Sequence, residues 1–274
     1  MTAPVGRARA ATWRPGLLLM NTPHEWRGDG PPLVLIAGLG AKGTSWHPFL
    51  EQAAKHFRVL TFDNRGSGRA PPIDGPLSLR DLACDLLRLL DAQGIERIGV
   101  VGRSMGGMIA QELALLAPER VAQLVLVSTA ARSDVHLAGV FELWARMAEA
   151  GVPAEIRHQS SLYWCVGREA LERDERVRSY LFAKARADRP ADYAVQARAC
   201  ARHDLLEALP GVSAPTLVVS GTDDRLTPVF HAEELAKAIP GARLAYIAGA
   251  GHLAYLEAEE SFNTEVLGFL GEDA

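Results

Sequence analysis

The chain has 274 residues, of which 48% are hydrophobic, and it carries a formal net charge of −4. This length favours one α/β domain with an insertion, and the hydrophobic share is enough for a large core. The acidic balance argues against nucleic acid or a membrane as the main partner. The three cysteines show no metal-ligand spacing, and no apolar run is long enough for a signal peptide or a membrane span. We therefore expect a cytoplasmic protein that binds no metal ion and no organic cofactor.

Short apolar runs alternate with helical patterns along most of the chain. Residues 12–20 indicate an antiparallel leading strand or hairpin. The predicted strands that follow are 33–37, 58–62, 97–101, 123–128, 215–220 and 242–247. The predicted helices between them include 45–56, 78–93, 105–117, 230–238 and 259–270. This alternation predicts a mostly parallel, doubly wound α/β sheet, and the uniformly apolar runs predict strands covered on both faces.

The alternation stops between about residues 131 and 212. Helical patterns there cover 136–150, 168–187 and 191–209, without a strand between them. We predict a helical cap at 131–212, inserted into a core formed by 1–130 and 213–274. Aromatic side chains of this cap are candidates for an apolar acyl pocket: Phe141, Trp144, Tyr163, Trp164 and Phe182. For any one of them, packing within the cap is the commoner outcome.

Residues 98–108, IGVVGRSMGGM, place a serine between a predicted strand and a predicted helix. Ser104 stands two positions from Gly102 and from Gly106, which is the G-x-S-x-G pattern of a nucleophile elbow. Glycines lack the β-carbons that would collide across so sharp a turn. The helix N-terminus after Ser104 offers unpaired N–H groups to a developing oxyanion. The pentapeptide alone also fits a tight connection with an idle serine.

A nucleophilic serine needs a base, and the base needs a group that fixes its tautomer. Asp223 and Asp224 follow the strand predicted at 215–220, and His252 follows the strand predicted at 242–247 in a glycine-rich loop. Asp134 is the only carboxylate near the end of the strand at 123–128, and it lies further away in sequence. The carboxyl ends of parallel strands meet at one edge of a sheet, where catalytic groups gather. We therefore expect Ser104, one aspartate and His252 to meet there.

These motifs, in this chain order, resemble the α/β-hydrolase family over nearly the whole sequence. The family pattern G-x-x-D-x-x-x-P fits Gly221 to Pro228 and makes Asp224 the implied acid, and the G-H loop fits Gly251-His252. The family turn D-x-R-G-x-G fits residues 63–68 and is interpreted as structural. The resemblance implies a Ser104–His252–Asp224 triad.

The resemblance also implies an oxyanion hole and a pocket. The loop at residues 37–40 corresponds to the family's His-Gly-x-Gly, so the backbone N–H groups of Leu39 and Met105 are the implied donors. Two positions depart from the family pattern: Ala37 replaces a histidine, and Arg103 stands beside the nucleophile where a histidine is frequent. Arg103 and Trp46 join the cap aromatics as candidate pocket residues.

The implied reaction is hydrolysis of a carboxylic ester, lactone or thioester through an acyl-enzyme, with a small acyl compound as the partner. The resemblance leaves open a tailoring or editing hydrolase or cyclase of secondary metabolism, C–C bond hydrolysis, and a haloperoxidase-like activity, since fold does not fix chemistry. A non-catalytic ligand-binding scaffold of the same fold is another alternative. Gly38, Gly40, Gly43 and Asp63 also approach a dinucleotide fingerprint, but the helix start predicted at Ser45 comes too late for that motif. The oligomeric state is not readable from the sequence.

Overall fold

The computed structural model describes residues 22–175, 177, 179 and 189–272. Its centre is a seven-stranded sheet in the order β1-β3-β2-β4-β5-β6-β7. The strands are β1 (His24–Arg27), β2 (Pro32–Ile36), β3 (Arg58–Phe62), β4 (Ile98–Arg103), β5 (Val121–Val127), β6 (Thr216–Gly221) and β7 (Arg243–Ile247). β1 pairs antiparallel with β3, and every other pairing is parallel. The sheet is therefore the mostly parallel one that the sequence predicts.

Strands β2 to β7 lie within two residues of their predicted positions. The strand predicted at 12–20 and the pocket residue Phe182 both lie outside the described residues. The leading antiparallel strand of the described chain is β1, which the sequence analysis missed. Its four residues, HEWR, alternate between half-buried and exposed. Such a short edge strand has no apolar run to mark it.

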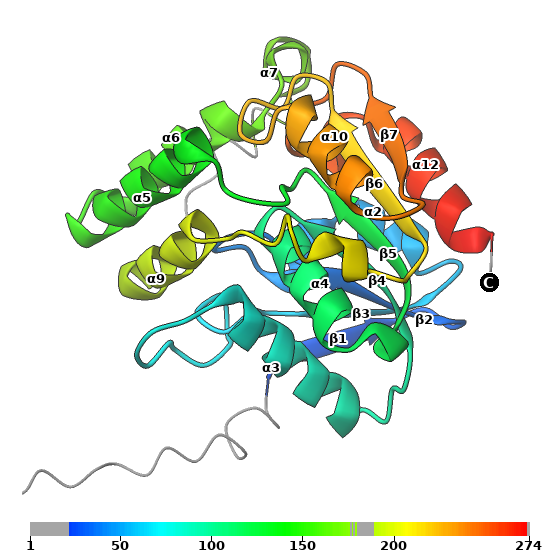
Figure 1. Cartoon of the computed structure of the whole chain (residues 1–274). Helices are drawn as coiled ribbons and strands as arrows, with labels where there is room; N and C mark the ends of the chain where they lie inside the picture. The colour runs from blue at the N-terminus through cyan, green and yellow to red at the C-terminus, as the bar shows by residue number, and fades with distance from the viewer. Residues whose placement is uncertain (1–21, 176, 178, 180–188, 273–274) are drawn as a thin grey trace, which may run out of the picture.

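Helices cover both faces of the sheet, as the apolar strands predict (Figure 1). The helices of the core are α2 (Phe49–Ala53), α3 (Leu79–Ala92), α4 (Met105–Leu116), α10 (Val229–Ala238), α11 (Ala254–Glu257) and α12 (Glu259–Gly271), with 3₁₀ turns η1 (Gly43–Trp46) and η2 (Pro118–Arg120). Val34 and Ile36 face a hydrophobic cluster with α3, α4 and α10, whereas Leu33 and Leu35 face one with α2 and α12. This alternation is that of successive side chains on a β-strand.

The prediction of a helix at 45–56 with Ser45 as its N-cap is wrong for the first turn. Residues 43–46 form η1 instead, and α2 begins only at Phe49. His47 has extended backbone angles, with φ −64° and ψ 137°. The ring of Pro48 disfavours helical angles at the residue before it, so the chain cannot run as one helix through His47.

A helical insertion lies between β5 and β6. It contains α5 (Val135–Glu149), α6 (Ala154–Cys165), α7 (Arg168–Arg173), α9 (Pro190–Ala201) and the turn η3 (Leu209–Gly211). In Figure 1, α5, α6 and α9 lie together to one side of the sheet. The helix predicted at 191–209 ends early, at Ala201, because the chain turns there to pair Asp204 with Arg132. That the insertion acts as a cap domain with the boundaries 131 and 212 stays a prediction.

The two ends of the insertion are joined at the core. The backbone N–H of Leu205 donates to the carbonyl of Ala131, and that of Ser133 donates to the carbonyl of His203. The Ser133 hydroxyl donates to the carbonyl of Cys200, 2.7 Å away. The insertion therefore leaves and rejoins the core at one place.

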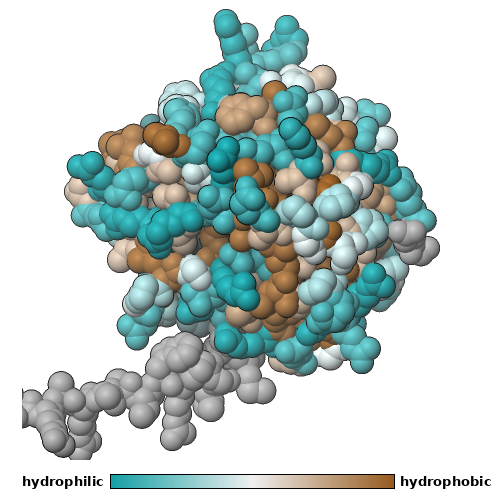
Figure 2. Space-filling model, viewed as in Figure 1, coloured by the Kyte–Doolittle hydropathy of each residue, from teal (hydrophilic) through white to brown (hydrophobic). Residues whose placement is uncertain are grey.

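Hydrophobic residues appear in separate patches among hydrophilic ones on the face in Figure 2. Among the described helices, none is both long and apolar enough to cross a membrane.

Candidate active site

Ser104 sits at the turn from β4 into α4, in a backbone conformation that few residues other than glycine adopt. Its φ is 57° and its ψ is −122°. A β-carbon at Gly102 would meet the carbonyl oxygen of Gly106 at 2.3 Å, and one at Gly106 would meet that of Ile36 at 2.1 Å. The two glycines therefore permit the turn, and α4, β2 and β4 pack too closely for any side chain there. Strain of this kind is typical of a residue that has a function.

Asp224 and His252 meet in the loops that follow β6 and β7. The Nδ1 of His252 lies 2.8 Å from Oδ2 of Asp224, and both side chains are buried. The carboxylate also accepts the N–H groups of Leu226 and Thr227 at Oδ1 and the Thr227 hydroxyl at Oδ2. With its oxygens held by these donors, Asp224 can orient the imidazole so that Nε2 is left to act as a base.

Glu257, which the sequence analysis missed, fixes the loop that carries His252. Its carboxylate accepts the backbone N–H groups of Gly251 at 2.9 Å, Gly167 at 2.8 Å and Leu253 at 3.1 Å. Burial raises the pKa of Glu257, and the three N–H donors oppose that rise. The only signal in the sequence was a carboxylate five residues after the histidine, on a helix of four residues.

The loop after β2 lies directly beside the nucleophile. A β-carbon at Gly38 would come within 3.4 Å of the Ser104 β-carbon. Within the described residues, neither the N–H of Leu39 nor that of Met105 donates a hydrogen bond to the protein. Gln196 of α9 braces this loop: its Oε1 accepts the N–H of Gly40, and its Nε2 donates to the carbonyl of Arg65. These two free N–H groups are the donors that the sequence analysis assigns to an oxyanion hole.

Ser104 and His252 open into one cavity of about 710 Å³ between the sheet edge and the insertion. This volume falls within the range of roughly 300–1,000 Å³ that is usual for small-molecule sites. The apolar side chains of its lining include Phe141, Trp144, Leu162, Leu226 and Leu253. Cys165 also lines the cavity, but burial raises the pKa of its thiol, so it stays protonated and is a poor competing nucleophile.

Comparison with known proteins identifies the family to which this fold belongs. A family model described as the alpha/beta hydrolase fold matches residues 31–259. The chain belongs to the α/β-hydrolase family. It is 35% identical to the putative carbamate hydrolase RutD of Azorhizobium caulinodans, covering 91% of this chain and 94% of that one. Among solved structures, a hydrolase from Pseudomonas aeruginosa PA01 has a TM-score of 0.84 at 33% identity and covers 90% of this chain and 93% of that one. The enol-lactonase from Burkholderia xenovorans LB400 has a TM-score of 0.82 at 30% identity, with coverage of 91% and 96%.

The predicted pocket residues of this α/β hydrolase divide into two groups. Phe141 and Trp144 line the cavity, and their contact with a substrate stays a prediction. Tyr163 does not line the cavity, and its side chain is 55% exposed. Trp164 packs against His136 with ring centroids 5.5 Å apart, away from the cavity lining. Both residues belong to α6, which the sequence analysis did not predict, so their directions could not be inferred.

Trp46 and Arg103 lie next to each other, and both contact the ring of Tyr255. Trp46 is fully buried and lies outside the cavity lining, with its ring 5.2 Å from that of Tyr255. The guanidinium of Arg103 lies 5.9 Å from the Trp46 ring and 5.3 Å from the Tyr255 ring. Arg103 is 6% exposed and lines the cavity beside Ser104.

Further lining residues, which the sequence analysis did not assign to the site, lie on α6 and around the start of α9. They are Arg157, His158 and Ser161 of α6, Tyr193 of α9 and Arg189 directly before α9. Helix α6 was missed because only Arg157 and Leu162 are buried along its twelve residues, so it has no apolar stripe.

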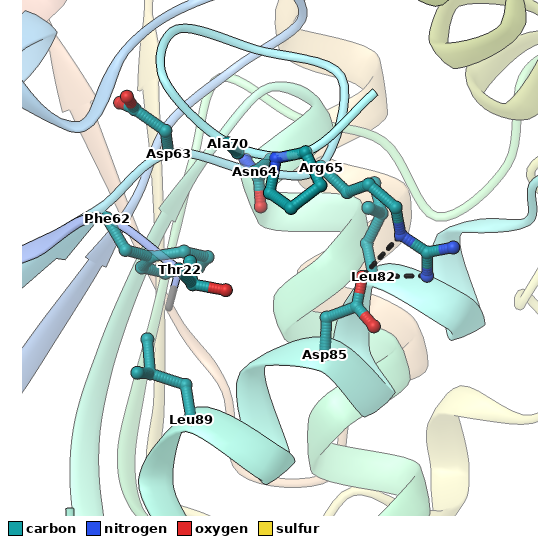
Figure 3. A pocket seen from close by; sticks show the side chains of 10 residues that line it. Thr22, Phe62, Asp63, Asn64, Arg65, Ala70, Leu82, Asp85 and Leu89 are labelled. Atoms are coloured by element: carbon teal, nitrogen blue, oxygen red, sulfur yellow. Dashed lines mark hydrogen bonds and ion pairs between the residues drawn. The ribbon is translucent and has the colours of Figure 1, made fainter. Parts of the chain in front are cut away.

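The structure disfavours a dinucleotide site at Asp63. Its carboxylate accepts the N–H groups of Gly43 and Arg69, each at 2.9 Å, and so closes its own loop. No α-helix starts among the glycines of 38–43, where only the 3₁₀ turn η1 begins at Gly43, and both oxygens of Asp63 already accept a backbone N–H. A small pocket beside this loop, closed by the ion pair between Arg65 and Asp85, measures only about 10 Å³ (Figure 3). That volume holds about one water molecule.

Proposed function

We propose that this α/β hydrolase is a serine hydrolase that cleaves a carboxylic ester, lactone or thioester of a small acyl compound. The observation that carries the proposal is the contact of 2.8 Å between His252 and Asp224, in a cavity that also holds Ser104 at a strained turn. The named activity of the enol-lactonase from Burkholderia xenovorans, at 30% identity, favours an ester-type bond. A cytoplasmic location stays a prediction from the sequence.

In the proposed first step, the Ser104 oxygen attacks the carbonyl carbon while Nε2 of His252 accepts the hydroxyl proton. The negative charge of Asp224 stabilises the imidazolium, and the N–H groups of Leu39 and Met105 stabilise the oxyanion. The tetrahedral intermediate then collapses, and His252 donates its proton to the leaving oxygen or sulfur. A water molecule, deprotonated by His252, attacks the acyl-serine and releases the acid with Ser104 restored.

Covalent labelling tests the nucleophile. A fluorophosphonate should add one phosphonate to the protein, and peptide mapping should locate it on Ser104. The Ser104→Ala variant should bind no label while keeping the melting temperature of the parent. A folded Ser104→Ala variant that still turns over esters would overturn the proposal, and an unlabelled, inactive parent would favour the non-catalytic scaffold.

A substrate panel tests the bond. Matched esters, lactones and thioesters of the same acyl group should be hydrolysed with a detectable acyl-enzyme, which quenching and mass spectrometry can trap. A panel in which no member gives a trapped acyl-enzyme would contradict the proposed reaction.

A further inference from the structure

The lining of the active-site cavity has one sign of charge, although the whole chain is acidic. Its described lining residues include no aspartate and no glutamate. They do include five basic side chains: Lys42, Arg69, Arg103, Arg157 and Arg189. Because the chain carries a formal net charge of −4, this concentration of cations at the nucleophile is a local feature. A cleft lined by one sign of charge attracts ligands of the other sign.

Arg103 differs from the other arginines of the cavity. Arg69 pairs with Glu25 at 3.4 Å, and Arg189 pairs with Asp192 at 2.9 Å. The Nε of Arg157 donates to the carbonyl of Val152 at 3.0 Å. The side chain of Arg103 makes no hydrogen bond and no ion pair within the described residues, and its Nε is buried without a partner. The rings of Trp46 and Tyr255 face its positive charge, but a ring face accepts none of the directional N–H donors of a guanidinium.

A buried and unpartnered guanidinium is costly for folding. Arg103 is 94% buried, so the fold carries this cost beside its own nucleophile. Groups of this kind are found where a ligand supplies the missing partner. The natural partner for the planar fork of arginine is a carboxylate, which accepts two parallel hydrogen bonds from it.

The position of Arg103 limits the distance from this carboxylate to the bond that is cleaved. A β-carbon added at Gly38 would lie 3.4 Å from the Ser104 β-carbon and 3.6 Å from Cζ of Arg103. The nucleophile and the guanidinium therefore flank the same loop residue. A carboxylate held by Arg103 must sit only a few bonds from the carbonyl that Ser104 attacks.

We infer that Arg103 binds a carboxylate of the substrate, and that the enzyme prefers short acyl compounds that carry this second, free carboxylate near the scissile carbonyl. This inference rests on the proposed function and names its substrate class. A charge-assisted, bidentate contact is worth a preference of about 10- to 100-fold over a neutral analogue.

Two ethyl esters of nearly equal shape test the inference. Monoethyl succinate ends in a carboxylate, and ethyl 4-methylpentanoate ends in an isopropyl group of similar size. Hydrolysis of each ester is measured by pH-stat titration, and the preference is the ratio of the two kcat/KM values. The parent should prefer monoethyl succinate by about 10- to 100-fold, and Arg103→Met should bring the ratio close to one. Arg103→Lys, which keeps the charge but loses the fork, should give an intermediate ratio.

Arg243→Met is the matched control. Arg243 also lies against an aromatic ring, that of Phe269, but it pairs with Glu272 and lies outside the cavity lining. Its loss should leave the ratio unchanged. A parent that hydrolyses both esters with a ratio near one would overturn the inference and leave the proposed function intact. An Arg103→Met variant that keeps the preference of the parent would also overturn the inference.

Binding separates the inference from the proposed function. Calorimetric titration of monoethyl succinate into the Ser104→Ala variant should show binding. The double variant Ser104→Ala, Arg103→Met should bind it at least 10-fold more weakly. If the parent hydrolyses neither ester and takes no fluorophosphonate, this binding still upholds the carboxylate site while the hydrolase proposal fails. Equal binding to both Ser104→Ala proteins would overturn the site.

Discussion

Gln196 on α9 accepts a hydrogen bond from the backbone N–H of Gly40, 3.2 Å away, and so ties the insertion to the loop that carries Leu39. The same side chain donates to the carbonyl of Arg65 at 2.7 Å and to the Ser67 hydroxyl at 3.1 Å. Gln196 is fully buried. One glutamine therefore positions two loops at the edge of the site.

We expect Gln196→Met to lower kcat about 10-fold, because the loop of the proposed oxyanion hole loses its brace. The melting temperature should also fall, since each buried group left without a partner costs about 1–3 kcal/mol. Gln123→Met is the control: Gln123 is buried and donates to the carbonyl of Phe269, far from the cavity. It should lose stability while its kcat stays that of the parent. Equal effects of the two variants on kcat would contradict a positioning role for Gln196.

Asp224→Asn should lower kcat by about 10³- to 10⁴-fold, because an amide can present its NH₂ group to His252 and favour the wrong tautomer. The adjacent Asp223 is the natural comparison. Its carboxylate accepts the N–H of Arg168 and lies away from the imidazole. Asp223→Asn should change kcat by less than about threefold on the same ester. A large loss in the Asp223 variant alone would reassign the acid.

Glu257→Gln should slow acylation about 10-fold without a matching change in substrate binding. Three backbone N–H groups share the carboxylate, whereas a glutamine offers them a single carbonyl oxygen. The His252 loop then loses at least one of its fixed contacts. Stopped-flow measurement of fluorophosphonate labelling reports this step directly. Glu233→Gln, which changes only an exposed carboxylate that accepts the Tyr246 hydroxyl, should label at the parent rate.

His203 should make the protein sensitive to acid. Burial lowers the pKa of His203 from 6.5 to about 4. As the pH falls below about 6.5 the unfolded chain binds a proton that the folded protein does not, so stability is lost between pH 6.5 and 4. The difference between the two pKa values corresponds to roughly 3 kcal/mol. Urea unfolding gives the free energy of unfolding at pH 7 and at pH 4. Between these two pH values, the free energy of His203→Leu should fall by about 3 kcal/mol less than that of the parent. His56→Leu, at an exposed histidine, should lose as much as the parent.

Much of the fold could be predicted from the sequence because its signals are local. Strands β2 to β6 are mostly apolar runs that are covered on both faces, and two glycines mark the sharp turn at Ser104 because no side chain fits there. The start of α3 is marked by Ser78, whose hydroxyl accepts the N–H of Asp81 in a capping box. Six strands and the main helices of the core follow from such patterns.

The parts that could not be predicted depend on contacts between distant segments. Gln196 and Glu257 are ordinary residues by sequence, and their importance comes from donors on loops of other elements. Helix α6 has no apolar stripe, because one of its sides faces the cavity and another is exposed. The directions of the Tyr163 and Trp164 side chains could not be predicted, because the helix that carries them was not predicted.

The backbone hydrogen bond between Leu205 and Ala131 joins the two ends of the insertion. Both of its ends enter the core at one point, so the sheet needs no particular length or number of helices between them. A foreign helical segment grafted between these residues has to reproduce this junction, and it also has to replace the contacts that Gln196 and Gly167 make with the loops of the site. The chemistry proposed for Ser104 and the choice of substrate can therefore diverge separately, since the first is built on the sheet and much of the cavity lining on the helices of the insertion.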